Sequence, residues 1–203
     1  MTSKSEDTRE HILTVAFDMF MQKGYKGVTM SDLERMTGLT KGAFYHYFKD
    51  KAKIFSAALS EKFGKMEFRP DSQWLKDVSL HDFIEAYVTY LGKVIHYFHH
   101  LQINYADLQF SNIVLDAIRF IPDFKENVKR RSSEEITMWE RVIFRAKENN
   151  EIKSDLETTV LSYTFLSLSH SVQKSIQTGK SGEHALSIIR LQFEQLYHLI
   201  KTS

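Results

Sequence analysis

The sequence predicts an all-α protein, and three observations support that prediction. The chain of 203 residues has only two prolines and eight glycines, whereas strand-rich folds need many turns built from these residues. Apolar residues recur at helical spacing over long segments. Hydrophobic residues make up 42% of the chain and charged residues 26%, which is a composition typical of a globular protein with a real core.

Charge and cysteine content narrow the possible functions. The formal net charge is +1, so any surface that binds anions has to be local. The chain has no cysteine, which excludes disulfides, thiolate metal sites and cysteine nucleophiles. The polar opening MTSKSEDTRE is unlike a secretory signal peptide, and no apolar run reaches the ~18–20 residues of a membrane span. We therefore expect a cytoplasmic protein.

The first helix is expected from Asp7 to Gly24. Asp7 and Glu10 have the spacing of a capping pair, and a glycine suits the left-handed position that ends a helix. Its apolar residues form one stripe: Ile12, Leu13, Ala16, Phe17 and Phe20.

A short second helix is expected to begin at Ser31. Glu34 follows three residues later, which is the spacing of a capping box. Leu33 and Met36 are expected to face inward, and Gly38 ends the helix after two turns. The turn that follows contains this glycine and leads directly into another short helix.

The third helix is expected from about Lys41 to Phe48, with Thr40 as its cap. Phe44 and Phe48 are four residues apart and form its inward face. Two short helices joined by such a turn form a helix-turn-helix, the arrangement that DNA-binding proteins place in the major groove. Four lysines and one aspartate lie within residues 41–53, which gives this segment a local positive charge.

Six further helices complete the expected fold, giving about nine helices in total. The first connects the domains over about residues 51–66, and the pattern then breaks at Pro70. We expect a DNA-binding domain at 1–50, this connecting helix, and a helical C-terminal domain at 67–203. The helices expected in the C-terminal domain cover about residues 80–100, 103–116, 122–149, 156–178 and 183–201.

Residues 12–59 resemble the TetR (tetracycline repressor) family of bacterial regulators. The resemblance rests on a first helix that ends in glycine and an aromatic residue, the turn GLTKG, and the run YHYFKDK. A weaker likeness covers RAKENNEIKSDLETTV, residues 145–160, where Asn150 replaces the family's usual glycine. The resemblance implies a homodimeric, sequence-specific transcriptional regulator, commonly a repressor, that binds a palindromic operator in double-stranded DNA and responds to a small-molecule effector.

The resemblance and the local chemistry predict the same DNA contacts. Lys41 can donate hydrogen bonds to guanine O6 and N7, while Gly42 and Ala43 allow the helix backbone to approach the groove floor. The tyrosine hydroxyls and the remaining lysines suit phosphates. The full predicted set is Thr29, Ser31, Thr40, Lys41, Gly42, Ala43, Tyr45, His46, Tyr47, Lys49 and Lys51.

The C-terminal domain is rich in aromatic residues. Most aromatics at helical spacing belong to a core, but the resemblance implies an effector pocket among the middle helices, and an aromatic lining suits a flat or apolar molecule. The predicted effector residues are Tyr87, Tyr90, Asn104, Tyr105, Trp139, Tyr163 and His170. We expect no cofactor.

The last two helices carry more apolar residues than one monomer can easily bury. The resemblance implies that they pair with their copies across a two-fold axis. The predicted dimer interface is Leu161, Phe165, Leu168, Val172, Leu186, Ile189, Phe193 and Leu196.

Three other functions are weighed against this interpretation. The chain could be a DNA-associated interaction module without a small effector, which a filled core would favour. His96, His99 and His100 share a helix face, but no acidic residue or cysteine accompanies them at ligand spacing, so we predict no metal site. Nothing in the sequence matches a phosphate loop or a serine elbow, and we predict no enzyme and no catalytic residue.

Overall fold

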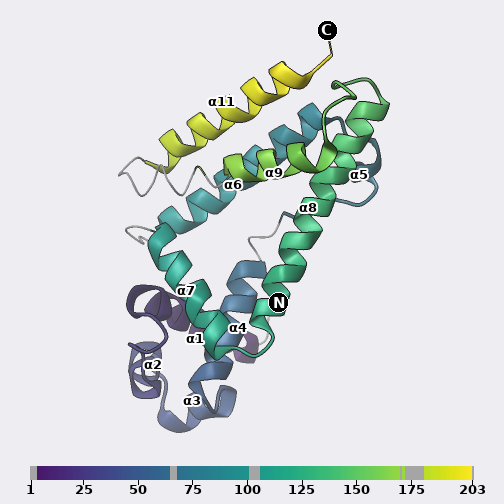
Figure 1. Ribbon diagram of the computed structural model, residues 1–203. Helices are drawn as coiled ribbons and strands as arrows, with labels where there is room; N and C mark the ends of the chain where they lie inside the picture. The colour runs from purple at the N-terminus through teal and green to yellow at the C-terminus, as the bar shows by residue number, and fades with distance from the viewer. Residues whose placement is uncertain (1–3, 65–67, 101–105, 170, 172–180, 203) are drawn as a thin grey trace. The chain divides into compact units, whose positions relative to one another are not determined.

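The structure is a computed structural model that describes residues 4–64, 68–100, 106–169, 171 and 181–202 (Figure 1). These residues form ten α-helices and no strand, apart from an isolated bridge between Ile152 and Lys201. The all-α prediction is confirmed. No helix within the described part of the chain is long and apolar enough to cross a membrane.

The chain forms two compact units. The first unit contains residues 1–67 and 101–126, and the second contains residues 68–100 and 127–203. The expected domain division differs from this one, because it assigned residues 101–126 to the C-terminal domain. Packing contacts, which local sequence patterns do not reveal, group this segment with the N-terminal helices.

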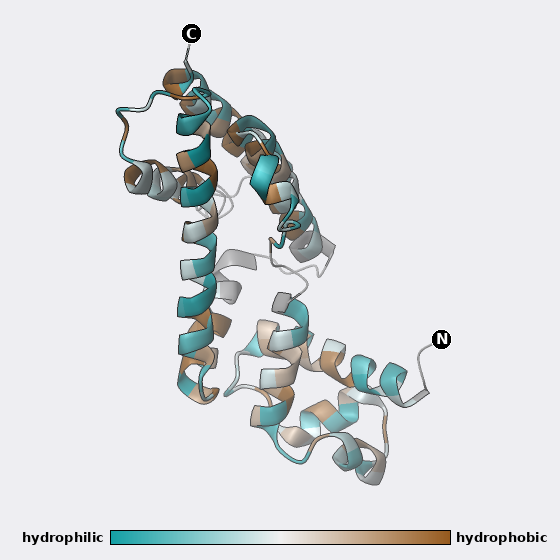
Figure 2. Ribbon diagram, turned by 90° about the vertical axis from the view of Figure 1, so that its right-hand side faces the viewer, coloured by the Kyte–Doolittle hydropathy of each residue, from teal (hydrophilic) through white to brown (hydrophobic). Residues whose placement is uncertain are grey.

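The first unit contains α1 (Lys4–Lys23), α2 (Met30–Thr37), α3 (Lys41–Tyr47), α4 (Lys51–Gly64) and α7 (Ala106–Phe120). Helix α1 packs on α2, α4 and α7, and α7 also contacts α4 (Figure 1). The predicted apolar stripe of α1 is buried throughout. Figure 2 shows that the first turns of α1 are hydrophilic, and α1 begins at Lys4 rather than at Asp7.

Two details of α2 differ from the prediction. The helix is capped by Thr29 with Asp32, not by Ser31 with Glu34, because the chain enters the helix two residues earlier. Leu33 is buried as expected, but Met36 is 57% exposed. Leu33 and Thr37 occupy the inward face of this two-turn helix, which leaves Met36 on the outside.

The described residues of the second unit form four further helices and most of a fifth. They are α5 (Trp74–Asp77), α6 (Leu80–His100), α8 (Phe124–Glu148), α9 (Thr158–Ser169) and α11 (Gly182–Ile200), with the first turn of α8 belonging to the first unit. Helix α11 packs on α6 and on α9. The short α5 lies in the segment that the sequence predicts as a break. Asn150 has φ 56°, the left-handed conformation that its place at a helix junction requires.

Trp139 of α8 lies in the core of the second unit and is fully buried. Its ring stacks on Phe165 at 4.9 Å and meets the ring edges of Phe83 at 4.7 Å and Tyr87 at 5.1 Å. Phe193 of α11 lies 6.0 Å from it. Aromatic rings from α6, α8, α9 and α11 therefore join these helices into one core.

The predicted dimer interface requires a correction. Leu161, Phe165, Ile189 and Phe193 are buried within the single chain, so they have no surface left to offer a second copy. Leu168, Leu186 and Leu196 are half-buried and pack against the same core, and Val172 lies outside the described residues. The apolar side chains that α9 and α11 expose are Val160, Tyr163, Leu191 and Leu199. These four exposed side chains are not members of the predicted interface set.

Candidate nucleic-acid interface

Helices α2 and α3 meet in a tight turn with defined caps at both ends. Gly38 ends α2 at φ 68°, the left-handed conformation that glycine adopts without strain. Thr40 begins α3, and its hydroxyl oxygen accepts a hydrogen bond from the backbone N–H of Ala43 at 3.3 Å. Phe44 is fully buried and Phe48 nearly so, as predicted. These two rings fix α3 against the unit and turn its other face outward.

The outward face of α3 presents most of the predicted DNA-binding set. The exposed members are Thr29, Ser31, Thr40, Lys41, Gly42, Ala43, His46 and Lys49, and the half-buried ones are Tyr45, Tyr47 and Lys51. Neither Lys41 nor Lys49 makes a hydrogen bond or ion pair with another described residue. Two exposed ammonium groups are therefore available to an anionic partner.

Gly42 has no packing reason to be a glycine. A Cβ placed there would meet no atom within 4 Å, and the residue lies inside a helix, where glycine is ~1 kcal/mol less favourable than alanine. The packing of the fold therefore does not require a glycine at this position. A glycine is suited to a surface whose backbone comes close to another molecule.

The tyrosines are held at the edge of this face. Tyr45 packs edge-on against Phe44, with ring centroids 5.7 Å apart. The Tyr47 hydroxyl donates to Ser5 Oγ of α1 at 3.4 Å, and its ring lies 5.4 Å from that of His46. Both rings are thereby oriented before any partner arrives.

Thr29 is engaged in the capping box. Its hydroxyl donates to Asp32 Oδ2 at 2.6 Å and accepts from the Asp32 backbone N–H at 3.1 Å. The Thr29 backbone N–H also donates to Asp32 Oδ2 at 3.1 Å, and the two bonds that Thr29 donates, first the hydroxyl's and then the backbone's, lower the pKa of the Asp32 carboxyl below its usual value. Asp32 also accepts a hydrogen bond from the Arg35 guanidinium at 2.8 Å, so three residues stabilise the start of α2.

Lys51 points into the protein. Its ammonium donates to the backbone carbonyl of Tyr25 at 2.9 Å and to that of Val28 at 2.8 Å. It also lies 4.2 Å from the centroid of the Tyr25 ring. A phosphate contact was predicted for Lys51, and the structure gives its charge internal partners.

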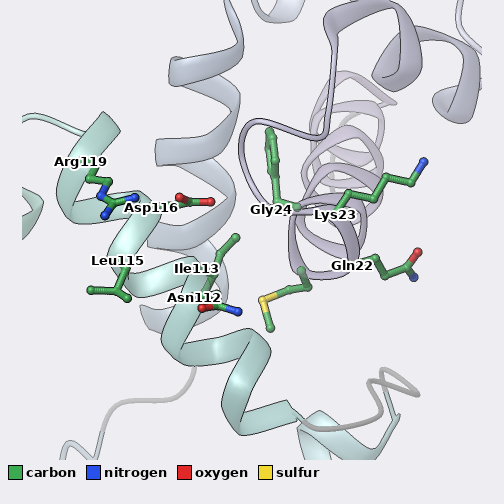
Figure 3. Close-up of a pocket in the computed structure, with 10 residues that line it drawn as sticks. Gln22, Lys23, Gly24, Asn112, Ile113, Leu115, Asp116 and Arg119 are labelled. Carbon is green, nitrogen blue, oxygen red and sulfur yellow. The ribbon is translucent and has the colours of Figure 1, made fainter.

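An open pocket of about 360 Å³ lies in the first unit, between the end of α1 and one side of α7 (Figure 3). Gln22 and Lys23 of α1 line it together with Gly24, which follows α1, and Asn112, Asp116 and Arg119 line it from α7. The predicted effector residues that the structure describes, Tyr87, Tyr90, Trp139 and Tyr163, do not line this pocket. The sequence offered no signal for it, because its two sides lie about ninety residues apart.

The predicted effector residues are scattered. Tyr87 and Trp139 are buried in the core of the second unit, and Tyr90 is half-buried beside them. Tyr163 is 59% exposed on α9, away from the buried aromatic core. Asn104, Tyr105 and His170 lie outside the described residues. Of the three clustered histidines, His96 is exposed. The side chains of His99 and His100 lie outside the described part of the structure.

Buried polar groups surround the aromatic core. The Tyr87 hydroxyl donates to Glu135 Oε1 at 2.6 Å, and burial raises the pKa of Tyr87 well above its usual value. The indole N–H of Trp139 finds no acceptor among the described residues. A buried donor without a partner costs about 1–3 kcal/mol.

Residues 12–58 match the family profile described as "Bacterial regulatory proteins, tetR family". This segment of the chain is similar to the TetR family. The TetR segment is the helix-turn-helix with its flanking helices α1 and α4, which is where the exposed set lies.

Several named proteins resemble the chain over about the same length. The HTH-type transcriptional regulator AcrR of Shigella flexneri is 35% identical over 77 residues, 36% of each chain. The HTH-type transcriptional repressor NemR of Escherichia coli strain K12 is 39% identical over 56 residues, 28% of each chain. The matches thus span about a third of the length of these relatives.

Solved structures match along nearly the whole chain. Reduced NemR of Escherichia coli has a TM-score of 0.61 at 17% identity and covers 97% of this chain and 100% of its own. A TetR regulator from Chloroflexus aurantiacus has a TM-score of 0.66 at 19% identity, over 98% of this chain and 99% of its own. At this identity the likeness establishes the fold, an N-terminal helix-turn-helix with a helical remainder.

Proposed function

We propose that this TetR-family protein is a homodimeric, sequence-specific DNA-binding transcriptional regulator, most simply a repressor, that acts in the cytoplasm. The observation that supports this most is the outward face of α3, where Lys41, Gly42 and His46 are exposed over a buried Phe44. The relatives that match this region are named as HTH-type transcriptional regulators and repressors. Nothing in their names describes an enzyme.

Base contacts and phosphate contacts divide between the exposed residues. Lys41 at the first turn of α3 reads a base, and Gly42 allows the backbone to come close enough for it to do so. Thr40, Tyr45, Tyr47 and Lys49 contact phosphates and fix the register.

A second copy supplies the symmetry that a palindrome requires. The apolar side chains that α9 and α11 leave exposed, Val160, Tyr163, Leu191 and Leu199, are the surface we assign to the dimer interface. The two α3 helices of a dimer then read half-sites about one helical turn, ~34 Å, apart or a near multiple.

An effector bound in the second unit modulates operator binding. The unpaired indole N–H of Trp139 supports this, because a ligand acceptor would satisfy it, and Tyr87 with Glu135 places a polar pair beside the same core. The effector acts only if it binds one conformer of the dimer more tightly than the other. The filled aromatic packing around Trp139 favours the second candidate, an interaction module that binds DNA without an effector.

Selection of bound sequences from a random DNA pool tests the proposal, with purified protein at physiological salt. We expect a palindromic consensus of two half-sites, which then serves as the operator for screening effectors by release. Binding without a consensus, with only a steep salt dependence, would contradict sequence-specific recognition and move the interaction module ahead.

A further inference from the structure

Tyr25 occupies the link between α1 and α2 and is held from two sides. On one side, its backbone N–H donates to Asp116 Oδ2 of α7 at 2.8 Å. On the other, its carbonyl accepts from the Lys51 ammonium of α4 at 2.9 Å. A single residue of the link is thus tied to two helices, α4 and α7, that both follow it in the sequence.

Aromatic packing completes the hold on Tyr25. Its ring stacks on Phe120 of α7 with centroids 4.4 Å apart and packs on Phe55 of α4 at 4.8 Å. The Lys51 ammonium lies over the same ring at 4.2 Å. Figure 3 shows Asp116 extending from α7 toward Gly24, where an added Cβ would lie 3.3 Å from Asp116 Oδ2.

The link leads directly into the first turn of α2. It runs from Gly24, which ends α1 in the left-handed conformation, to Thr29, the cap of α2. Lys51 also binds the carbonyl of Val28, the residue directly before that cap. Any shift of the link therefore shifts the first turn of α2 and, through the short turn at Gly38, the base-reading helix α3.

We propose that Lys51 and Asp116 are positioning residues for DNA binding, which hold the segment Gly24–Thr29 from opposite sides and thereby fix the helix-turn-helix. The proposal rests on the proposed DNA-binding function. It assigns to Lys51 a structural use of its charge in place of a phosphate contact, because its ammonium already has two carbonyls and a ring as partners. A binding surface needs such support, since a loosely held constellation loses its geometry.

The sign of the Asp116 effect separates positioning from electrostatics. Asp116 is negatively charged, so its removal would strengthen binding to anionic DNA if charge alone mattered. Positioning predicts the opposite, a loss of affinity. Asp116→Ala and Asp116→Asn remove the same charge, but an asparagine amide oxygen can still accept the N–H of Tyr25.

Affinity for the selected operator is therefore measured for both variants by fluorescence anisotropy. We expect Asp116→Ala to bind about tenfold more weakly than the wild type, and Asp116→Asn to stay within about threefold of it, as the loss of one charge-assisted hydrogen bond implies. Equal or tighter binding by both variants would overturn the assignment for Asp116.

The salt dependence of binding tests Lys51 against Lys49, a lysine two residues away whose side chain has no described partner. Loss of one phosphate contact lowers the slope of log K against log salt by about 0.9. We expect that decrease for Lys49→Gln. For Lys51→Gln we expect weaker binding with the wild-type slope. A decrease in slope equal to that of Lys49→Gln would show that Lys51 contacts phosphate instead.

Amide hydrogen exchange gives a readout that needs no DNA. We expect the Tyr25 amide to exchange faster in Asp116→Ala than in the wild type, and to stay protected in Asp116→Asn. If the wild type selects no DNA sequence, the proposed function fails while this exchange difference still decides whether the link is held. Unchanged exchange in Asp116→Ala would overturn the hold itself. If Asp116→Ala does not fold, Lys51→Gln decides by the same measurement.

Discussion

Helices α3 and α9 each bury one phenylalanine completely, Phe44 and Phe165, yet they leave very different surfaces behind. Around Phe44, α3 exposes lysine, glycine, alanine and histidine. Around Phe165, α9 exposes Val160 and Tyr163 while Leu161 faces the core. Burial alone therefore does not distinguish these helices.

The difference lies in what each exposed face can bind. The face of α3 suits an anionic partner that comes close to the backbone, and the face of α9 suits an apolar partner. The proposed function assigns the face of α3 to DNA and the exposed face of α9 to a second copy of the chain. Each of the following substitutions tests one side of this comparison.

The largest expected effect is a loss of folding stability on substitution of Phe165 in α9. Tyr163, two residues earlier on the same helix, serves as the comparison. Phe165→Ala removes a fully buried ring that stacks on Trp139 at 4.9 Å, so we expect a loss of ~3–5 kcal/mol of unfolding free energy, measured by urea denaturation. Tyr163→Ala removes a ring that is 59% exposed. We expect it to leave the folding of the monomer nearly unchanged and to weaken the dimer in sedimentation. A comparable folding loss in both variants would show that the two faces of α9 are not distinct.

Lys41 provides the next largest effect, on the side of α3. Lys41→Ala should cost ~1–3 kcal/mol of operator binding and relax the base preference at one position of each half-site, because a lysine that contacts guanine discriminates between bases. The measurement is a repeated selection with the variant. Lys49→Ala serves as the comparison and should weaken all sequences alike. An unchanged consensus with Lys41→Ala would exclude Lys41 as the base reader.

The sequence predicted α3 better than α9, for a physical reason. In α3 and its C-terminal cap, Phe44 and Phe48 are the only large side chains without a polar group, and they lie four residues apart, so the inward side was evident. In α9 apolar residues occur on both faces, and helical spacing cannot say which one the core uses. The interface was therefore placed on Leu161 and Phe165, which the structure buries.

Long-range ties were beyond the reach of sequence patterns. The Tyr25–Asp116 hydrogen bond joins residues 91 positions apart, and the Lys51–Tyr25 bond joins residues 26 apart. Motif spacing describes neighbours within a few turns. For that reason the sequence predicts a phosphate contact for Lys51, and no pattern indicates a role for Asp116.

Thr29 offers a smaller effect that concerns folding of the DNA-binding unit. Thr29→Ala removes the hydroxyl that caps α2, and we expect a loss of ~1 kcal/mol of unfolding free energy. Ser31→Ala is the matched control, because Ser31 is exposed and does not cap the helix. Urea denaturation of both variants checks this. An equal loss of unfolding free energy in Ser31→Ala would instead support the capping box predicted from the sequence, Ser31 with Glu34.

Gly42 should show opposite effects on folding and on DNA binding. Gly42→Ala should stabilise the fold by ~0.5–1 kcal/mol, because alanine favours a helix and its Cβ has open space. The same methyl group should weaken operator binding if α3 approaches the groove floor closely. Thermal unfolding and operator titration measure the two effects. Gly38→Ala is the contrasting control, since φ 68° makes alanine destabilising there. Unweakened operator binding by Gly42→Ala would mean that α3 keeps its distance from the bases.

The smallest expected effect is a change in folding stability at low pH, caused by Asp32. The lowered pKa of Asp32, caused first by the hydrogen bonds from Thr29, means that the ionised carboxyl stabilises the fold. This contribution is fully present above the usual aspartate value of 3.8 and is lost as the pH falls through the lower folded pKa. The first turn of α9 has no acidic residue, so its start lacks this sensitivity.

Asp32→Asn isolates the effect, because every other acid is common to both proteins. We expect the unfolding free energy of the wild type to exceed that of Asp32→Asn at neutral pH, and the difference to disappear as the pH falls below about 4. Urea denaturation across this pH range measures it. A difference that persists at low pH would show that the Asp32 side chain stabilises α2 by its shape and not by its charge, and the start of α2 would then resemble that of α9.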